Sequence, residues 1–146
     1  MSTRSVICKE TLNKTYVGIY CHHDGYPQWV GKTLLDHYSD RDRVEKLLHL
    51  GDLSSLEEKI EPDADRIHTF DNPQGDVCVA YHRDRGEELR QARPIKLDKA
   101  AHEVYWAEFM YVYMQDGTWY FADLCSDNPI LIPLTKNYTE YEDEDE

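Results

Sequence analysis

The chain has 146 residues, of which 40% are hydrophobic, so it is long enough to form one domain with its own apolar core. Its formal net charge of −13 excludes nucleic-acid binding by counterion release, because that mechanism needs clustered Lys and Arg. We expect neither a signal peptide nor a membrane-spanning helix, because no apolar stretch of the required length occurs. The four cysteines are widely spaced and form no CxxC pair, which indicates free thiols and a cytoplasmic location in a host cell.

Two strands are predicted near the N-terminus, over residues 5–10 and 15–22. Side chains alternate in the second strand, and its aliphatic set is assigned to the core: Val17, Ile19 and Cys21. Tyr16, Tyr20 and His22 then share the opposite, more polar face, where Gly18 would leave space between them.

A helical hairpin should follow the second strand. Asp24-Gly25 ends the strand, Pro27 suits the first turn of a helix, and an apolar i, i+4, i+8 pattern continues to Tyr38. Ser39 with Asp42 resembles a capping box for a second helix, and Gly51 suits its end. The buried stripe of that helix should be Val44, Leu47 and Leu48.

A β-hairpin is predicted over residues 104–124, because Asp116-Gly117 lies between two aromatic-rich runs. A two-residue type I′ turn would place Tyr113 opposite Tyr120, with positive φ at both Asp116 and Gly117. One face of this hairpin would then carry a second candidate binding surface, made of Tyr105, Tyr111, Tyr113 and Tyr120. Pro129 and Pro133 indicate that the following segment is an extended edge.

These elements predict a single α+β domain over residues 1–137, an antiparallel sheet with a short helical hairpin packed on one face. Residues 138–146 should form a disordered acidic tail, because six of the seven residues from Glu140 to Glu146 are acidic. A solvated tail is the simplest interpretation. The alternative is that the tail mimics a nucleic-acid backbone or docks on a basic partner.

Catalytic and cofactor motifs are incomplete. Gly31-Lys32-Thr33 ends like a P-loop, but Tyr26 occupies the position where that pattern needs a glycine. His22 and Asp24 would ligate a metal only with a third residue such as His82 or His102, and a histidine hydrogen-bonded to a tyrosine is the simpler interpretation. We therefore assign no catalytic residue, no metal and no cofactor.

The candidate binding site is the corner after the second strand. A turn that only reverses the chain needs little more than Asp-Gly, yet this one is rich in histidine and aromatic residues that are costly to expose without a use. Alternatively, Tyr26 and Trp29 staple the helix to the sheet. The candidate partner-binding residues are Tyr16, Tyr20, His22, His23, Asp24, Tyr26 and Trp29.

One stretch resembles a family of small uncharacterised proteins from phages and integrated mobile elements. The resembling residues are Gly18-Ile-Tyr-Cys-His-His-Asp-Gly-Tyr-Pro27, Val30-Gly31, Leu34-Leu35, His37-Tyr38, Val44 and Leu50-Gly-Asp-Leu-Ser-Ser-Leu56, with weaker echoes at Trp119-Tyr120. The family has no assigned activity to transfer.

The genomic setting that the resemblance implies is one in which small accessory proteins antagonise host defence. We therefore expect a non-enzymatic protein that binds and inhibits a host protein such as a CRISPR nuclease. The alternatives are a small-ligand binder that sequesters a nucleotide signal and, third, a metal-dependent hydrolase. A homodimer is also compatible with the sequence.

Overall fold

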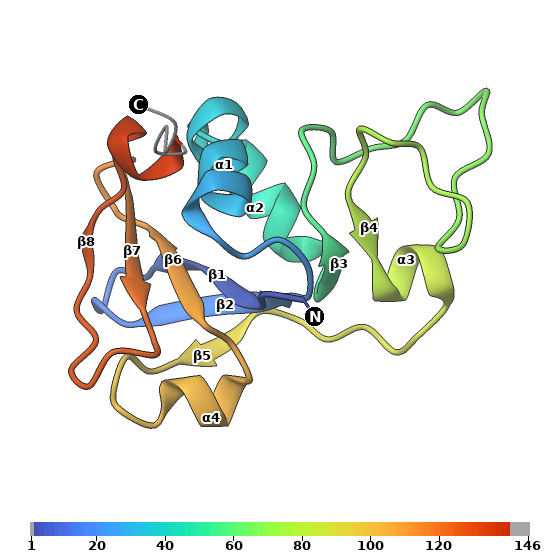
Figure 1. The fold of residues 1–146 in the computed structure, drawn as a ribbon. Coiled ribbons are helices and arrows are strands. Elements are labelled where there is room, and N and C mark those ends of the chain that lie inside the picture. The colour runs from blue at the N-terminus through green and yellow to red at the C-terminus, as the bar shows by residue number, and fades with distance from the viewer. Residues whose placement is uncertain (1, 141–146) are drawn as a thin grey trace, which may run out of the picture.

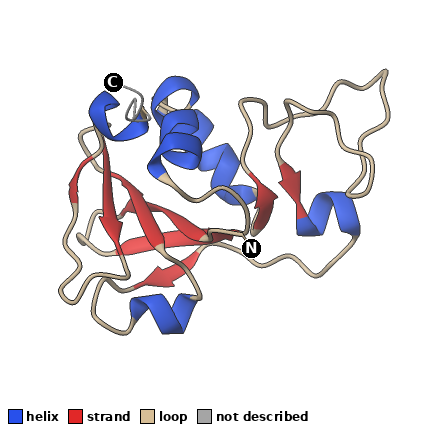
Figure 2. Ribbon diagram, viewed as in Figure 1, coloured by secondary structure: helices blue, strands red, loops and turns tan. Residues whose placement is uncertain are grey.

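The computed structural model describes residues 2–140 and confirms a single α+β domain (Figure 1). Short strands and short helices alternate along the chain, and loops connect them over much of its length (Figure 2). The elements in chain order are β1 (Ser5–Glu10), β2 (Tyr16–Cys21), the π-helical turn η1 (Pro27–Gly31), α1 (Lys32–His37), α2 (Arg41–His49), β3 (Leu53–Ser55), β4 (Val79–Ala80), α3 (Tyr81–Arg85), β5 (Arg93–Ile95), α4 (Ala101–Tyr105), β6 (Phe109–Tyr113), β7 (Trp119–Asp123), β8 (Ile132–Pro133) and the 3₁₀ helix η2 (Lys136–Thr139). Within residues 2–140, no helix has the length and apolar character needed to cross a bilayer.

The sheet is mixed rather than wholly antiparallel as predicted. Its strand order is β4-β3-β2-β1-β6-β7-β8, and β5 pairs with β2 beside this path. The pairs β1–β6 and β2–β3 are parallel. The helical hairpin connects β2 to β3, and a helical crossover of this kind returns the chain in the same direction, which places β3 parallel to β2.

Both faces of the sheet are covered. Helices α1 and α2 lie over one face, whereas β5 and α4 lie on the opposite side (Figure 1). The helix side buries the larger core, which includes Ile19 and Cys21 of β2 as the alternation predicted. The opposite side buries a smaller cluster that includes Val6, Met110 and Val112. A sheet covered on both faces explains why every residue of β6 is buried or half-buried.

The helical hairpin agrees with the prediction except at one cap. Helices η1 and α1 are continuous and end before Tyr38, and the stripe of Val44, Leu47 and Leu48 is buried. The N-cap of α2 is Asp40, whose carboxylate accepts a hydrogen bond from the Arg43 amide, instead of Ser39. Ser39 uses its carbonyl oxygen to accept a hydrogen bond from the hydroxyl of Tyr113.

The β6–β7 hairpin is present, but its register is shifted by one residue from the prediction. Met114 pairs with Thr118 through a 2.8 Å hydrogen bond, so the loop holds three residues and ends at Gly117, which has φ +88°. Asp116 lacks the positive φ that a type I′ turn requires. Tyr113 therefore faces Trp119, and every side chain of β7 moves to the opposite face from the one predicted.

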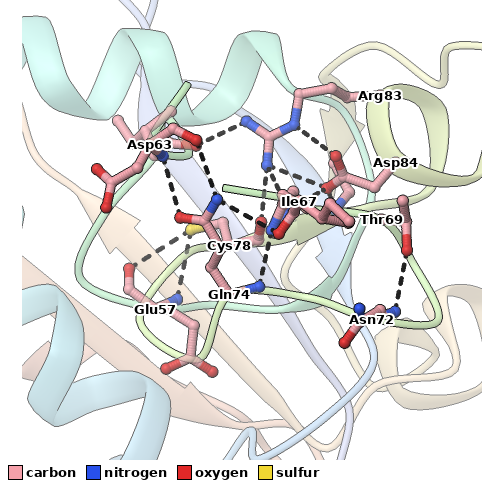
Figure 3. Close-up of polar contacts among 12 residues, drawn as sticks. Glu57, Asp63, Ile67, Thr69, Asn72, Gln74, Cys78, Arg83 and Asp84 are labelled. Atoms are coloured by element: carbon pink, nitrogen blue, oxygen red, sulfur yellow. Dashed lines mark hydrogen bonds and ion pairs between the residues drawn. The ribbon is translucent and has the colours of Figure 1, made fainter. Parts of the chain in front are cut away.

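A long segment, residues 56–78, connects β3 to β4. Polar side chains hold this segment together and tie it to α3, as Figure 3 shows. Gln74 donates from its side-chain amide to the carbonyl oxygens of Asp63 and Arg66, and Arg83 donates to those of Ile60 and Cys78. These bonds satisfy backbone carbonyls that regular secondary structure would otherwise pair.

The folded domain extends further than residue 137. Tyr138 in η2 packs edge-on against Phe121 with 5.0 Å between ring centroids, and Thr139 is buried. The start of the predicted tail at residue 138 is therefore wrong for these two residues. Residues 141–146, where the disorder was predicted, lie outside the described part of the chain.

Candidate functional site

The corner after β2 (residues 22–29) is held by backbone hydrogen bonds to distant segments. The Gly25 amide donates to the Thr3 carbonyl at 2.8 Å, and the Gly25 carbonyl accepts from the Tyr111 hydroxyl at 2.6 Å. Asp24 adopts φ +60°, and its carbonyl accepts from the Val30 amide at 3.0 Å. The corner is therefore fixed before any partner arrives, which lowers the entropy lost on binding.

Two large aromatic side chains project from this fixed corner. Tyr26, the N-cap residue of η1, is 50% exposed, and Trp29, within η1, is 52% exposed. The Lys32 amide reaches back to the Pro27 carbonyl, which is the wide turn of a π-helix, a feature frequent at functional sites. The exposure of Tyr26 and Trp29 argues against a purely stapling role, since a residue that staples the helix to the sheet would be largely buried.

A groove of about 710 Å³ begins at this corner and is called here the C-terminal groove. Tyr26 contributes to its rim, because its ring lies 5.7 Å from that of Phe109, which lines the groove. The complete lining is Pro27, Gln28, Phe109, Phe121, Asp123, Ser126, Ile130, Ile132, Asn137, Tyr138 and Glu140. The groove thus lies between η1 and the C-terminal segment that follows β7.

The C-terminal groove is largely apolar and has two acidic lining residues. Five of its lining residues are aromatic or aliphatic side chains, Phe109, Phe121, Ile130, Ile132 and Tyr138. Asp123 and Glu140 supply negative charge, and no Lys or Arg is among the described residues that line it. Such a surface favours a ligand that has an apolar part next to a positive charge.

The two predicted histidines begin the corner and contact one another. The Tyr20 hydroxyl is hydrogen-bonded to His22 Nδ1 at 2.7 Å, and the His22 and His23 rings meet edge-on at 4.7 Å. Burial, with further contributions from His23 and Arg4, lowers the pKa of His22, so the ring is neutral at pH 7. Residues 2–140 contain no group of three or more His, Cys, Asp or Glu side chains arranged to hold a metal ion.

The seven predicted residues therefore do not form one site. Tyr26 contacts Phe109 beside the C-terminal groove, whereas Tyr20 is hydrogen-bonded to His22 on the face of β2 opposite Ile19 and Cys21. Tyr16 packs against the smaller core cluster at the far end of the strand. Gly18 does not create space either, because a Cβ there would meet Cys8 Sγ at 2.5 Å, which means that β1 and β2 approach closely.

The prediction that four tyrosines form a second candidate surface on one face of the hairpin is wrong. Tyr111 and Tyr113 are buried in the larger core, where their hydroxyls donate to backbone carbonyls, whereas Tyr105 packs against the smaller core cluster. Tyr120 faces away from Tyr113, because the one-residue register shift reversed the two faces of β7. Four tyrosines that were expected on one face are thus divided between two.

A buried histidine–aspartate pair outside the corner was not predicted, and its geometry favours a structural role. His68 Nε2 lies 3.2 Å from Asp84 Oδ2, and both side chains are 3% exposed. The other ring nitrogen, Nδ1, accepts a hydrogen bond from the backbone amide of Gln74 at 3.0 Å. Both nitrogens are occupied within the protein, so neither faces a substrate as a general base must.

Sequence reasoning missed the C-terminal half of the groove. Ile130 is 62% exposed and Tyr138 is 43% exposed, in a segment that was interpreted only as an edge and a tail. A cluster of large apolar residues in a stretch with two prolines was the available signal.

A scan against protein-family models and searches of curated proteins and of solved structures found no match to this chain.

Proposed function

We propose that this chain is a non-enzymatic interaction protein that binds a host protein through the C-terminal groove. The observation that supports this most directly is the combination at the corner: Tyr26 is half exposed on a fixed turn, and its ring contacts Phe109 in a largely apolar groove that also carries two acidic residues. Aromatic residues that are exposed and held rigidly are typical anchors of protein interfaces. The resemblance of residues 18–56 to phage proteins supports a host-defence protein, for example a CRISPR nuclease, as the partner that is inhibited.

The partner segment should be apolar and basic. Its apolar side chains would cover Phe109, Ile130 and Tyr138, and a Lys or Arg next to them would meet Asp123 or Glu140. A second copy of this chain is a poorer occupant, because two molecules of net charge −13 repel each other. The acidic composition of residues 140–146 adds to the attraction for a basic partner.

A pull-down from host lysate with matched variants tests this proposal. Ile130→Ala and Tyr26→Ala alter the groove and its rim. Ile67→Ala is the control, because Ile67 is an equally apolar residue that is 71% exposed on the long loop away from the groove. Circular dichroism should show that all three variants are folded.

We expect one host protein to be retained by the wild type and by Ile67→Ala but lost with both groove variants. Retention should weaken as salt rises, because the charges are exposed and therefore screened. If the captured protein binds all three variants equally, the groove is not its binding site. Glu140→Lys should weaken retention as well, and Asp71→Lys, on the long loop, is the control for its change of charge.

Small-ligand binding is a second candidate function, and a different part of the molecule favours it. The supporting feature is a cleft beside Tyr20, which is described in the next subsection. For the third candidate, a metal-dependent hydrolase, the described residues offer no ligand cluster.

A further inference from the structure

A cleft of about 470 Å³ opens on the side of the sheet that β5 and α4 cover, and is called here the arginine cleft. It is separate from the C-terminal groove, since the two share no lining residue. Its volume lies within the range of about 300–1,000 Å³ that is usual for small-molecule sites. The lining residues are Val6, Tyr20, Asp52, Arg90, Arg93, Pro94, Val104, Tyr105 and Trp106.

The charges in the arginine cleft leave one cation in excess. Asp52 is 10% exposed and accepts from both terminal nitrogens of Arg93, at 2.8 and 3.2 Å, and from the Tyr20 amide at 3.0 Å. Arg90 reaches the same carboxylate only at 3.7 Å, and its side chain is 67% exposed. One carboxylate therefore faces two guanidinium groups, and Arg90 is the more weakly held and the more accessible of the two.

Aromatic rings form the walls of the arginine cleft. Trp106 is 69% exposed and adopts φ +55°, a left-handed conformation that is unusual for so bulky a residue. Strain of this kind concentrates at binding sites and must be maintained by neighbouring contacts. Arg4 supplies one: its guanidinium lies 5.7 Å from the centre of the Trp106 ring and is itself held by Glu108 at 3.1 Å.

The other two rings are fixed by hydrogen bonds. The Tyr105 hydroxyl accepts from the Lys96 amide at 2.9 Å, and the Tyr20 hydroxyl is bonded to His22. Rings that are already ordered stack on a planar ligand at little entropic cost. The cleft thus offers planar surfaces and, next to them, the exposed and weakly paired guanidinium of Arg90.

We propose that the arginine cleft binds a purine nucleoside monophosphate. The base would stack on Trp106 and the phosphate would pair with Arg90, whose planar fork matches phosphate oxygens. A polynucleotide is disfavoured, because the chain carries a net charge of −13 and would repel a long polyanion. The ligand is therefore a free mononucleotide.

A neighbouring hollow limits the number of phosphates. This hollow, of about 270 Å³, shares Tyr20, Asp52 and Arg90 with the arginine cleft, so a longer phosphate chain on Arg90 would extend into it. Glu87 and Glu88 line it, and Arg85, its other cation, is already paired with Glu87. Additional phosphates would meet like charge, so a triphosphate should bind no more tightly than the monophosphate.

Isothermal titration calorimetry of the full chain tests the proposal, with adenosine and guanosine monophosphates, the matching nucleosides, inorganic phosphate and adenosine triphosphate. We expect saturable binding of a monophosphate, and affinities about tenfold or more weaker for the nucleoside and for phosphate alone. If neither monophosphate shows saturable binding at millimolar concentration, the proposal is overturned. Tighter binding of the triphosphate would overturn the assignment to a monophosphate.

Variants of the cleft residues test where the ligand binds. Arg90→Ala should weaken binding about tenfold, whereas Arg66→Ala, at a similarly exposed arginine in the long loop, should not. Trp106→Asn removes the ring but tolerates the left-handed backbone, and should also weaken binding about tenfold, with Trp106→Phe restoring most of it. Equal affinities for Arg90→Ala and Arg66→Ala would overturn the proposed site.

The proposed protein-binding function can fail independently of this inference. Tyr26→Ala, outside the arginine cleft, is the control for Trp106→Asn: it should leave nucleotide affinity unchanged while it reduces retention of the host protein. If a cleft variant does not fold, amide chemical shifts of the wild-type protein decide the question. Shifts confined to residues 20, 90–94 and 104–106 support the arginine cleft, and shifts at 26–29 and 123–132 contradict it.

Discussion

The buried hydroxyl of Tyr111 donates a hydrogen bond to the carbonyl oxygen of Gly25, 2.6 Å away and 86 positions earlier in the chain. This bond ties the corner after β2 to the middle of β6. Burial raises the pKa of Tyr111 well above its usual value, so the hydroxyl stays protonated and the bond is permanent at neutral pH.

Tyr111→Phe should destabilise the domain by about 1–3 kcal/mol, because the Gly25 carbonyl loses its buried donor. Urea unfolding followed by circular dichroism measures this. Tyr120→Phe is the control, since Tyr120 is half buried on the neighbouring strand and the described structure shows no hydrogen bond from its hydroxyl. Equal unfolding midpoints for the two variants would contradict a role for the bond in holding the corner.

Gly117→Val should cost about 1–2 kcal/mol, because a β-branched residue is strained at the φ of +88° that closes the β6–β7 loop. Gly75→Val provides the comparison: Gly75 lies in the long loop, and a Cβ there would meet nothing within 4 Å. Thermal unfolding of both variants gives the difference. A Gly117→Val protein as stable as Gly75→Val would indicate a different loop conformation.

Asp84→Asn should destabilise the domain by about 2 kcal/mol, because it removes the charge that Arg83 and His68 share. Burial alone would raise the pKa of Asp84, but hydrogen bonds from Arg83 and from the Ala80 amide outweigh it and lower the pKa below 3.8. The carboxylate's contribution is therefore complete above about pH 4 and is lost as the pH falls further. The difference in stability between wild type and variant should shrink below pH 4 in urea titrations, and a difference that is constant with pH would contradict this.

Stability should also fall at alkaline pH. Burial raises the pKa of Cys21 from 9.0 to about 12, and burial also raises the pKa of Cys8 and of Cys78. These thiols stay protonated in the folded state but ionise in the unfolded chain above about pH 9, so each lowers stability by up to about 1.4 kcal/mol per pH unit above that point.

Cys21→Ala should flatten the decline between pH 9 and 11, whereas Cys125→Ala should change it less, because Cys125 is exposed. Urea unfolding at a series of pH values under reducing conditions measures both slopes. Identical slopes for the wild type and Cys21→Ala would show that another group controls the alkaline transition.

The sequence determined the elements whose signals are local. Alternation in β2 identified Ile19 and Cys21 as core residues, the i, i+4 pattern located the helical hairpin, and Gly117 marked the turn between β6 and β7. It also located the corner, where Tyr26 and Trp29 are indeed half exposed. Each of these depends on neighbours within a few positions, for which periodicity and turn chemistry are informative.

Only the tertiary structure decided which distant segments meet. A loop of three residues instead of two reversed the faces of β7, so Tyr120 lies on the face opposite the buried Tyr111 and Tyr113 of β6. The C-terminal groove joins η1 to residues more than 80 positions away, and the arginine cleft joins Tyr20 to Arg90 and Trp106. Local pattern carries no information on such contacts, because they are set by parallel strand pairing and by the packing of both faces of the sheet.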